Sequence, residues 1–537
     1  MGSKLSKQIV TSSIAAPGFA GLNLQDAPTS LEAGFALEAN NCIIDKFGRI
    51  GARKGWTTYL PTNADLSTAE VKTIAQMLSP TTNDNQLFAA GNNKLFLSTG
   101  SALAQKLVRN SGDTANATYT ITNSHWQVAS LPDVPNARAR AIITQAGHKA
   151  LYFSYSGVTS SYVFKILADV ATIPVTPIAH TSSTFTPNIC LAAYGRIWVA
   201  DIAGDRQTVY FSDLTDPLNF QTGTAGALNI NEVVGDGDPI VGLASHNGFL
   251  IIFCENHIVV YSAAQDPASL ALADIVNGIG CVARDSIQNT GSDVVFLSAT
   301  GVRSFTRTIQ EKSMPMRDIS KNVRDELLES LTSTSDLKTI KSGYSSIEAA
   351  YILSFAEEDI VYCFDMRGAL PDGSARATTW TTITPTAFCT TANREFLIGK
   401  AGYIGLYNGY SDNGSPYRMV YYSSYFDFQQ PTVSKILKKV EMLILGAQNQ
   451  DITMKWDFDF KKSYQSSTIT VDPTTIAEYG IGEYNIGNYS GSIIIFNLNL
   501  NAGGTGKVLQ FGFETDIDDN AVSIQKVDVF VKGGKTL

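Results

Sequence analysis

Charged residues are scarce in this sequence of 537 residues, at 17% of the chain against 44% hydrophobic residues. The 40 Lys and Arg are outnumbered by 49 Asp and Glu, which gives a net charge of −9. An acidic chain lacks the basic footprint of a protein that reads nucleic acid. The apolar composition also argues against disorder. So few charges indicate that much of the surface is covered by protein, in a large interior or between subunits.

Cysteine is also scarce, and its spacing excludes two classes of site. The six cysteines are scattered, with no C-x-x-C pair and no spacing of a zinc finger: Cys42, Cys190, Cys254, Cys281, Cys363 and Cys389. A disulfide framework is therefore not expected. Most of these residues lie in apolar runs, where a reduced cysteine packs as a small hydrophobic side chain.

Long apolar runs and the common enzyme motifs are absent. No run is long enough to cross a bilayer as a helix, so we expect no membrane span. The sequence contains no G-x-S-x-G, no G-x-x-x-x-G-K-[ST] and no H-E-x-x-H motif. Its five histidines form no close pair of the kind that binds metal: His125, His148, His180, His246 and His257. We therefore predict that the chain is not an enzyme, with no catalytic residues, no cofactor and no metal site.

Four polar segments have both a structural and a functional interpretation. Gly235, Asp236, Gly237, Asp238 and Pro239 could supply oxygen ligands to a cation, but they lack the spacing of an EF-hand, and a tight turn is the simpler interpretation. The same holds for Asp516, Asp518 and Asp519. Gly480, Gly482 and Gly487 lack the strand and helix of a dinucleotide site. The segment 411–417 (SDNGSPY) resembles a sialidase aspartate box without its spacing.

The most informative pattern is a pair of short apolar runs that recurs seven times at a spacing of about 50 residues. Each pair is broken by a small or polar turn, as in LFAAGNNKLFLSTG, and is typical of a β-hairpin. The copies begin at Leu87, Leu151, Ile197, Phe249, Val294, Tyr351 and Phe396. A hairpin cannot bury its apolar face alone, so a period of this length predicts stacked units such as propeller blades.

The hairpins divide the chain into three expected regions. Residues 61–429 are predicted to form a β-propeller of six to eight blades. Within them, apolar residues at helical intervals after Ser320, a good N-cap, predict one short helix packed on the outside: Ile319, Val323, Leu327, Leu328 and Leu331. After about residue 430, Trp456, Phe458 and Phe460 alternate with polar residues. Such alternation predicts an antiparallel β-sandwich over 430–537.

Residues 1–60 contain no copy of the hairpin unit and are rich in Gly, Ala, Asn and Pro. We interpret them as an extended N-terminal arm. Arg49, Arg53 and Lys54 form the densest basic cluster of the chain. This cluster could be a solvated turn, or it could contact a neighbouring subunit or DNA.

Residues 192–220, with the hairpins that follow up to about residue 310, resemble the tail nozzle proteins of short-tailed bacteriophages. The elements that carry the resemblance are Tyr210 to Asp213 (YFSD), the hairpin from Phe249 to Ser262, and the turn from Leu297 to Gly301. The stretch from Gly21 to Trp56 is similar to the opening of phage tail and stopper proteins. These motifs are turns and core strands, so they identify a scaffold and no reaction.

The resemblance implies a structural subunit of the virion tail, made in the host cytoplasm. It implies a homo-oligomer, usually a hexameric ring, below the portal and adaptor proteins and next to tail fibres or spikes. The channel of such a ring retains packaged double-stranded DNA and conducts it during ejection, without sequence-specific binding. One alternative is a glycan-binding or glycan-cleaving tail propeller, and another is an intracellular scaffold propeller. The glycan alternative requires Arg clustered with Glu or Asp at one end of the propeller.

Overall fold

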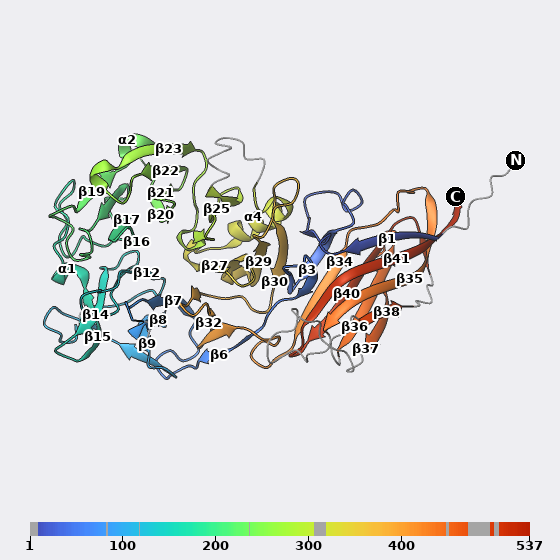
Figure 1. The fold of residues 1–537 in the computed structure, drawn as a ribbon, viewed down its shortest axis with the longest axis horizontal. Helices are drawn as coiled ribbons and strands as arrows, with labels where there is room; N and C mark the ends of the chain where they lie inside the picture. Colours follow the sequence, from blue (N-terminus) through green and yellow to red (C-terminus); the bar gives the residue numbers. More distant parts are fainter. Residues whose placement is uncertain are drawn as a thin grey trace.

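A computed structural model describes residues 9–81, 84–116, 119–235, 237–305, 318–446, 450–470, 494–498 and 504–536. The protein has two parts that lie side by side along its longest axis, as Figure 1 shows. One is a ring of small antiparallel sheets built from the middle of the chain. The other is a sandwich of two larger sheets, and it holds both ends of the described chain.

The ring is a β-propeller, and the described residues form seven blades. The first three blades follow one another along the chain. Blade 1 consists of β7 (Val71–Met77), β8 (Gln86–Gly91), β9 (Lys94–Ser98) and β10 (Leu103–Lys106). Blade 2 consists of β12 (Gln127–Ser130), β13 (Ala141–Thr144), β14 (Leu151–Ser156) and β15 (Ser161–Ile166), with β11 (Val108–Arg109) added outside. Blade 3 consists of β16 (Ile189–Ala193), β17 (Arg196–Ala200), β18 (Thr208–Phe211) and β19 (Gly226–Asn229).

The remaining blades complete the circle. Blade 4 consists of β20 (Ile240–His246), β21 (Phe249–Cys254), β22 (His257–Ser262) and β23 (Ala271–Asn277). Blade 5 has three described strands, β24 (Gln288–Asn289), β25 (Val294–Ser298) and β26 (Gly301–Ser304). Blade 6 consists of β27 (Ile340–Ser345), β28 (Ala350–Phe355), β29 (Ile360–Asp365) and β30 (Arg376–Trp380). Blade 7 consists of β31 (Phe388–Thr390), β32 (Phe396–Lys400), β33 (Tyr403–Tyr407) and β6 (Trp56–Leu60).

The seven predicted hairpins are all present, one in each blade. In six blades the hairpin forms the second and third strands, and in blade 2 it forms the third and fourth. First strands of successive blades contact one another around most of the ring. The prediction of an all-β propeller is therefore confirmed, with a blade number inside the expected range.

Apolar side chains packed between blades hold the ring together. Phe253 of blade 4 and Phe296 of blade 5 lie with their ring centroids 4.9 Å apart, and both are completely buried. Burying a phenylalanine contributes roughly 1.5–3 kcal/mol relative to exposure. Apolar clusters of this kind recur between neighbouring blades. Each hairpin therefore buries its apolar face against the adjacent blade, as the repeat predicted.

The predicted helix is α4 (Arg324–Ser333), and the 3₁₀ turn Lys321–Val323 precedes it. Ile319, Val323 and Leu327 are buried in a cluster with strands of blades 5 and 6, which confirms the helical spacing. Ser320 does not cap α4. Its hydroxyl instead accepts a hydrogen bond from the amide of Val302 at 2.9 Å, because the turn lies directly against β26. Two further helices have four residues each, α1 (Leu167–Val170) and α2 (Asn231–Val234).

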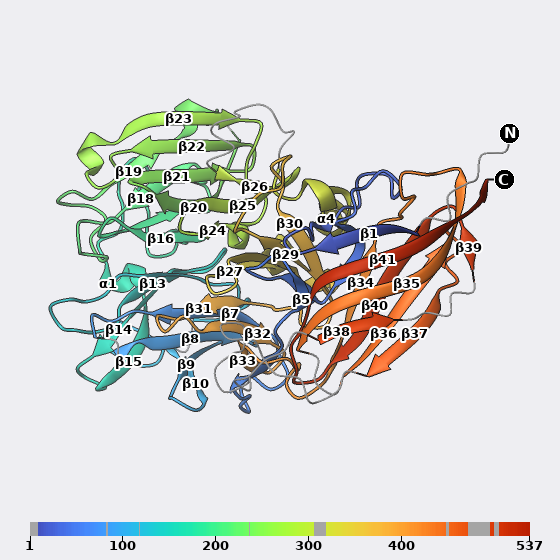
Figure 2. The same ribbon diagram turned by 45° about the vertical axis from the view of Figure 1, so that its right-hand side comes forward.

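The second part is the predicted antiparallel sandwich, turned into view in Figure 2. One sheet contains β35 (Val433–Gly446), β41 (Val522–Thr536), β38 (Ile494–Leu498), β39 (Thr505–Gly506), β1 (Ile9–Ala15), β4 (Cys42–Ile44) and β5 (Ile50–Ala52). The other contains β34 (Tyr417–Ser423), β40 (Leu509–Ile517), β36 (Asp451–Phe458), β37 (Gln465–Thr470), β3 (Phe35–Asn40) and β2 (Gly21–Leu22). The alternation holds for Trp456 and Phe458, which are buried, but β36 ends there and Phe460 is half exposed.

The N-terminal segment differs from the predicted arm, because its strands pair within the chain. β1 pairs with β41, and β3 lies between β30 of blade 6 and β34 of the sandwich. β6 pairs with β33 and so closes blade 7. The propeller therefore also contains β6, which lies before residue 61, and the sandwich also contains β34, before residue 430, and the N-terminal strands. Local patterns cannot reveal such pairings, because the partners lie far apart along the chain.

No described helix is long and apolar enough to cross a bilayer.

Candidate functional site

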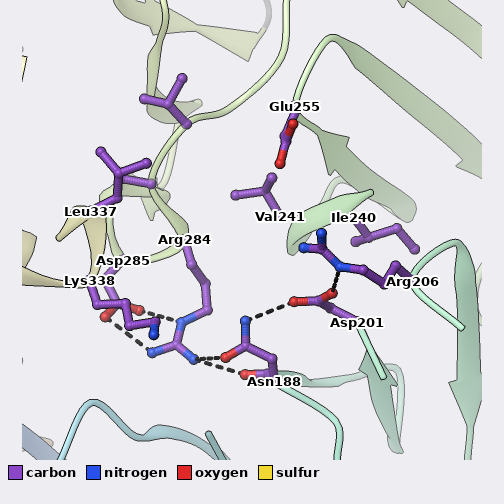
Figure 3. Close-up of a pocket in the computed structure, with 12 residues that line it drawn as sticks. Asn188, Asp201, Arg206, Ile240, Val241, Glu255, Arg284, Asp285, Leu337 and Lys338 are labelled. Carbon is purple, nitrogen blue, oxygen red and sulfur yellow. Dashed lines mark hydrogen bonds and ion pairs between the residues drawn. The ribbon is translucent and has the colours of Figure 1, made fainter. Parts of the chain in front are cut away.

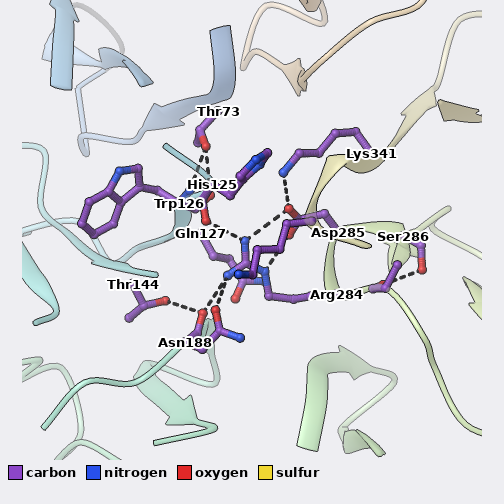
Figure 4. Close-up of polar contacts among 12 residues, drawn as sticks. Thr73, His125, Trp126, Gln127, Thr144, Asn188, Arg284, Asp285, Ser286 and Lys341 are labelled. Carbon is purple, nitrogen blue, oxygen red and sulfur yellow. Dashed lines mark hydrogen bonds and ion pairs between the residues drawn. The ribbon is translucent and has the colours of Figure 1, made fainter. Parts of the chain in front are cut away.

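The centre of the propeller is crossed by the side chain of Arg284, which precedes β24 of blade 5 (Figure 4). Its Nε and one Nη2 hydrogen go to the two carboxylate oxygens of Asp285, at 2.8 and 3.2 Å. Its Nη1 group donates to the carbonyl and the side-chain oxygen of Asn188, at 2.8 and 2.9 Å. Nη2 also reaches the carbonyl of His125 at 3.0 Å. The five guanidinium hydrogens thus all have acceptors.

Two of these partners, Asn188 and His125, lie across the ring from Arg284. Asn188 directly precedes β16 of blade 3, and His125 precedes β12 of blade 2. A side chain of blade 5 therefore touches the backbone of two blades across the axis at hydrogen-bond distance. The propeller's own channel is closed at this level.

A second buried cation completes the axial cluster, which comprises Asn188, Arg284, Asp285 and Lys341. The ammonium group of Lys341, on β27, donates to Asp285. Burial opposes ionisation of Asp285, but Arg284 and Lys341 outweigh it and hold the pKa of this carboxyl well below its usual range. Burial lowers the pKa of Lys341, and Asp285 opposes that shift. Two cations and one carboxylate leave the axial cluster with an excess positive charge.

His125 adds no charge to this site. Burial, with Lys341 and Lys72 nearby, lowers its pKa to about 3, so the imidazole is neutral at pH 7. A neutral ring beside two cations avoids a further like-charge repulsion.

A pocket of about 150 Å³ opens beside the axial cluster (Figure 3). It lies where the loops before the first strands of blades 3 to 6 meet the turns after β17 and β21. Its polar lining consists of Asn188, Asp201, Arg206, Glu255, Arg284, Asp285 and Lys338. Ile240, Val241, Val282, Ala283 and Leu337 form its apolar lining. The pocket therefore combines three basic and three acidic side chains with an apolar wall.

Two of the three residues of the predicted basic cluster, Arg49 and Arg53, are buried and so do not belong to a solvated turn. Arg53 is completely buried at the junction of propeller and sandwich. Its guanidinium binds both carboxylate oxygens of Asp412, at 2.9 and 2.7 Å, and stacks over the ring of Tyr417. It also donates to Asn41 and Thr382, at 3.0 and 2.6 Å, and to the carbonyl of Lys54 at 2.8 Å. Arg49 is also buried, 5% exposed, against the ring of Phe47.

The same junction accounts for the segment that resembles an aspartate box. Asp412 is the partner of Arg53, and Ser411 donates to Asp519 of the sandwich. Gly55 allows this close approach, since a Cβ atom at this position would lie 2.0 Å from the carbonyl oxygen of Ser411. The segment is therefore an interdomain contact.

Of the other candidate cation ligands, Asp238 and Asp516 have protein partners. Asp238 accepts from the amide of Asn256 and from Nδ1 of His257, at 3.0 and 2.6 Å. Asp516 pairs with Arg418 at 3.0 Å. Within the described ranges no group of three or more His, Cys, Asp or Glu side chains could hold a metal ion. Asp236, Gly480, Gly482 and Gly487 lie outside the described residues.

Sequence reasoning missed the axial cluster and the pocket. The available signal was position: Arg284 and Asp285 stand ten and nine residues before the hairpin at Val294, and Asn188 stands nine residues before the hairpin at Ile197. In this propeller both positions face the axis. Polar residues at this position, nine or ten residues before an apolar hairpin, were the signal that could have identified the site.

No family model matches the chain, and no curated protein matches it. Among solved structures, it is similar to the extracellular domain of the one-component system BT4673 of B. thetaiotaomicron, at 10% identity and a TM-score of 0.37. That similarity covers 78% of this chain and only 46% of the other. A streptogramin B lyase matches at 10% identity and a TM-score of 0.34, over 64% of this chain and 95% of the other. The Pan2 WD40 domain of Neurospora crassa matches at 9% identity and a TM-score of 0.36, over 66% of this chain and 96% of the other. We infer no activity, ligand or partner from similarities this weak.

Proposed function

We propose that this protein is the subunit of a ring-shaped bacteriophage tail nozzle, built from six copies, whose channel retains packaged DNA and conducts it during ejection. The proposal rests on the sequence resemblance described above. The resembling segments are core strands of this fold: Tyr210 lies on β18, and the hairpin from Phe249 to Ser262 is β21 and β22. The N-terminal stretch supplies β2 to β6, which join propeller and sandwich.

The closed axis of the propeller determines where DNA could pass in the proposed assembly. Duplex DNA is roughly 20 Å across, as its groove dimensions imply. The hydrogen bonds of Arg284 across the axis leave no such opening within one copy. In the proposed assembly, DNA therefore passes through a channel between copies, and each propeller acts as a solid wall element.

The negative net charge of the chain is consistent with a channel through which DNA must pass without binding to the wall. Each copy carries −9, so six copies together carry 6 × −9, or −54. A field of this sign disfavours adhesion of the phosphate backbone and permits passage. The buried state of Arg53 and Arg49 fits this interpretation, because the two arginines of the densest basic cluster in the sequence are not available to phosphate.

The remaining parts of the proposal concern partners. A position in the virion tail would place adaptor or portal proteins at one end of the ring, and tail fibres or spikes at its side. Loops between blades are the expected contact sites, since binding residues concentrate in loops on a rigid scaffold. The N-terminal segment is not proposed as a tether to neighbours, because β1 and β3 are paired within the subunit.

Native mass spectrometry of the purified full-length chain tests the oligomer. The expected species has six times the mass of one 57.8 kDa chain. A monomer of 57.8 kDa at every concentration used would contradict the proposal. Deleting residues 1–45 is a poor test, because that deletion removes β1 to β4 and would damage the sandwich itself.

A further inference from the structure

Three exposed charged side chains line the pocket beside the axial cluster and, among the described residues, have charged atoms without a protein partner. The guanidinium of Arg206 donates to Asp201 through Nε at 2.7 Å. Within the described part of the chain, its two Nη groups have no hydrogen-bond partner, and neither does the ammonium group of Lys338 or the carboxylate of Glu255. Arg206, Lys338 and Glu255 all line the pocket, and Figure 3 shows them around it.

The floor of the pocket is already fixed. The side-chain amide of Asn188 donates to Asp201 at 2.9 Å, and its oxygen accepts from Arg284. Asp201 in turn holds Arg206 in place. A ligand would therefore meet an arranged floor and a positioned Arg206, while Lys338 and Glu255 would become ordered on binding.

Size and lining restrict the class of ligand. The volume of the pocket is about 150 Å³. Pockets for drug-sized molecules begin at roughly 300 Å³. This pocket is therefore about half of that size. Only a molecule such as one sugar ring or one amino acid fits. Val241 and Leu337 offer it an apolar wall, and Leu337 is 42% exposed.

We propose that this pocket binds a small carboxylate-bearing ligand. Its carboxylate lies between Arg206 and Lys338, and a hydroxyl or ammonium donor of the ligand faces Glu255. A guanidinium binds a carboxylate through two parallel hydrogen bonds, and the second cation adds attraction. The three acidic side chains of the lining oppose a dianion such as phosphate, whereas one negative charge is balanced by the two free cations.

Two sources share this chemistry, a sugar acid and an amino acid, and the role of Glu255 separates them. An amino acid places an ammonium group beside Glu255, so neutralising that carboxylate removes an ion pair. A sugar acid donates a hydroxyl hydrogen there, which a glutamine side chain still accepts. Glu255→Gln should therefore weaken the binding of an amino acid much more than the binding of a sugar acid.

Isothermal titration calorimetry of the full chain tests the proposal with D-glucuronate, L-alanine, D-glucose and inorganic phosphate as probes. At least one carboxylate probe should bind saturably to the wild type, while D-glucose and phosphate bind at least tenfold more weakly. Arg206→Gln and Lys338→Gln should each weaken the binding of that probe about tenfold, which corresponds to about 1.4 kcal/mol. Lys461→Gln, at an exposed position of the sandwich, is the matched control and should leave binding unchanged.

Three results would overturn the proposal. The first is no saturable binding of either carboxylate up to about 10 mM. The second is that both variants, Arg206→Gln and Lys338→Gln, keep the thermal stability of the wild type and bind the carboxylate probe as tightly as the wild type does. The third is phosphate or glucose binding as tightly as the carboxylates. None of these outcomes bears on the oligomeric ring, which is tested by mass.

Discussion

Replacing Arg53 with methionine tests whether the junction between propeller and sandwich depends on one buried ion pair. The substitution keeps an unbranched apolar side chain but removes five hydrogen bonds, among them the bidentate contact with Asp412. The carboxylate of Asp412 is only 11% exposed and would lose its cation. Removing one partner of a buried pair costs about 3–5 kcal/mol, because the other charge remains buried.

The expected shift in melting temperature follows from the size of the chain, which has 537 residues. An unfolding entropy of about 2.1 cal/mol/K per residue gives about 1.1 kcal/mol/K for a chain of this length. A loss of about 3–5 kcal/mol in the free energy of unfolding then lowers the melting temperature by about 3–5 °C. Differential scanning calorimetry measures this shift directly.

Two further variants make the experiment specific. Lys94→Met is the control, because Lys94 also forms an ion pair, with Asp65 at 2.9 Å, but the two side chains are 32% and 45% exposed. Its loss should cost less than about 1 kcal/mol. In the double variant Arg53→Met with Asp412→Leu both charges of the pair are removed together, so much of the lost stability should return. The reasoning would be refuted if Arg53→Met melted within about 1 °C of the wild type, or if the two substitutions were simply additive.

Three other predictions concern the axial cluster, the sandwich and the thiols. Asp285→Asn leaves Arg284 and Lys341 as buried cations without a counter-charge. The free energy of unfolding should therefore fall by about 3–5 kcal/mol in a chemical denaturation experiment, and an unchanged midpoint would contradict the cluster. Burial opposes ionisation of Glu514, but hydrogen bonds from Lys455, Tyr422 and Arg418 outweigh it and lower its pKa to about 2. The ionised Glu514 carboxylate therefore stabilises the fold fully above the unfolded pKa near 4.5, and this stabilisation is lost as the pH falls through about 2. The melting temperatures of the wild type and Glu514→Gln should differ at pH 7 and converge towards pH 2. A difference that stays constant with pH would contradict this. Five of the six cysteines are buried and Cys389 is partly buried. A thiol reagent should therefore label fewer than one thiol per native chain within minutes, and all six after denaturation. Rapid labelling of two thiols in the native chain would contradict the fold.

The sequence and the structure agree where apolar residues recur locally. The hairpins from Leu87 to Phe396 were predictable because each carries its own turn and its own pair of apolar runs. The sandwich strands around Trp456 and Val529 were predictable from alternation. Both patterns depend only on neighbours within a few residues.

The parts that sequence analysis missed depend on contacts between distant residues. β1, the first described strand, pairs with β41, the last one, and β6 closes blade 7 beside β33. Arg53 was expected in solvent or at a partner because Asp412, which it binds, is 359 residues away. Arg284 was missed for the same reason, since its acceptors on Asn188 and His125 meet only after seven blades have closed.

An electron cryomicroscopy map of the purified assembly tests the central claim most directly. We expect a ring of six copies with an axial bore between subunits that is wider than the roughly 20 Å of duplex DNA. We also expect closed density along each propeller axis at Arg284. A single copy, a ring whose bore is too narrow for duplex DNA, or DNA density running through the centre of a propeller would contradict the account.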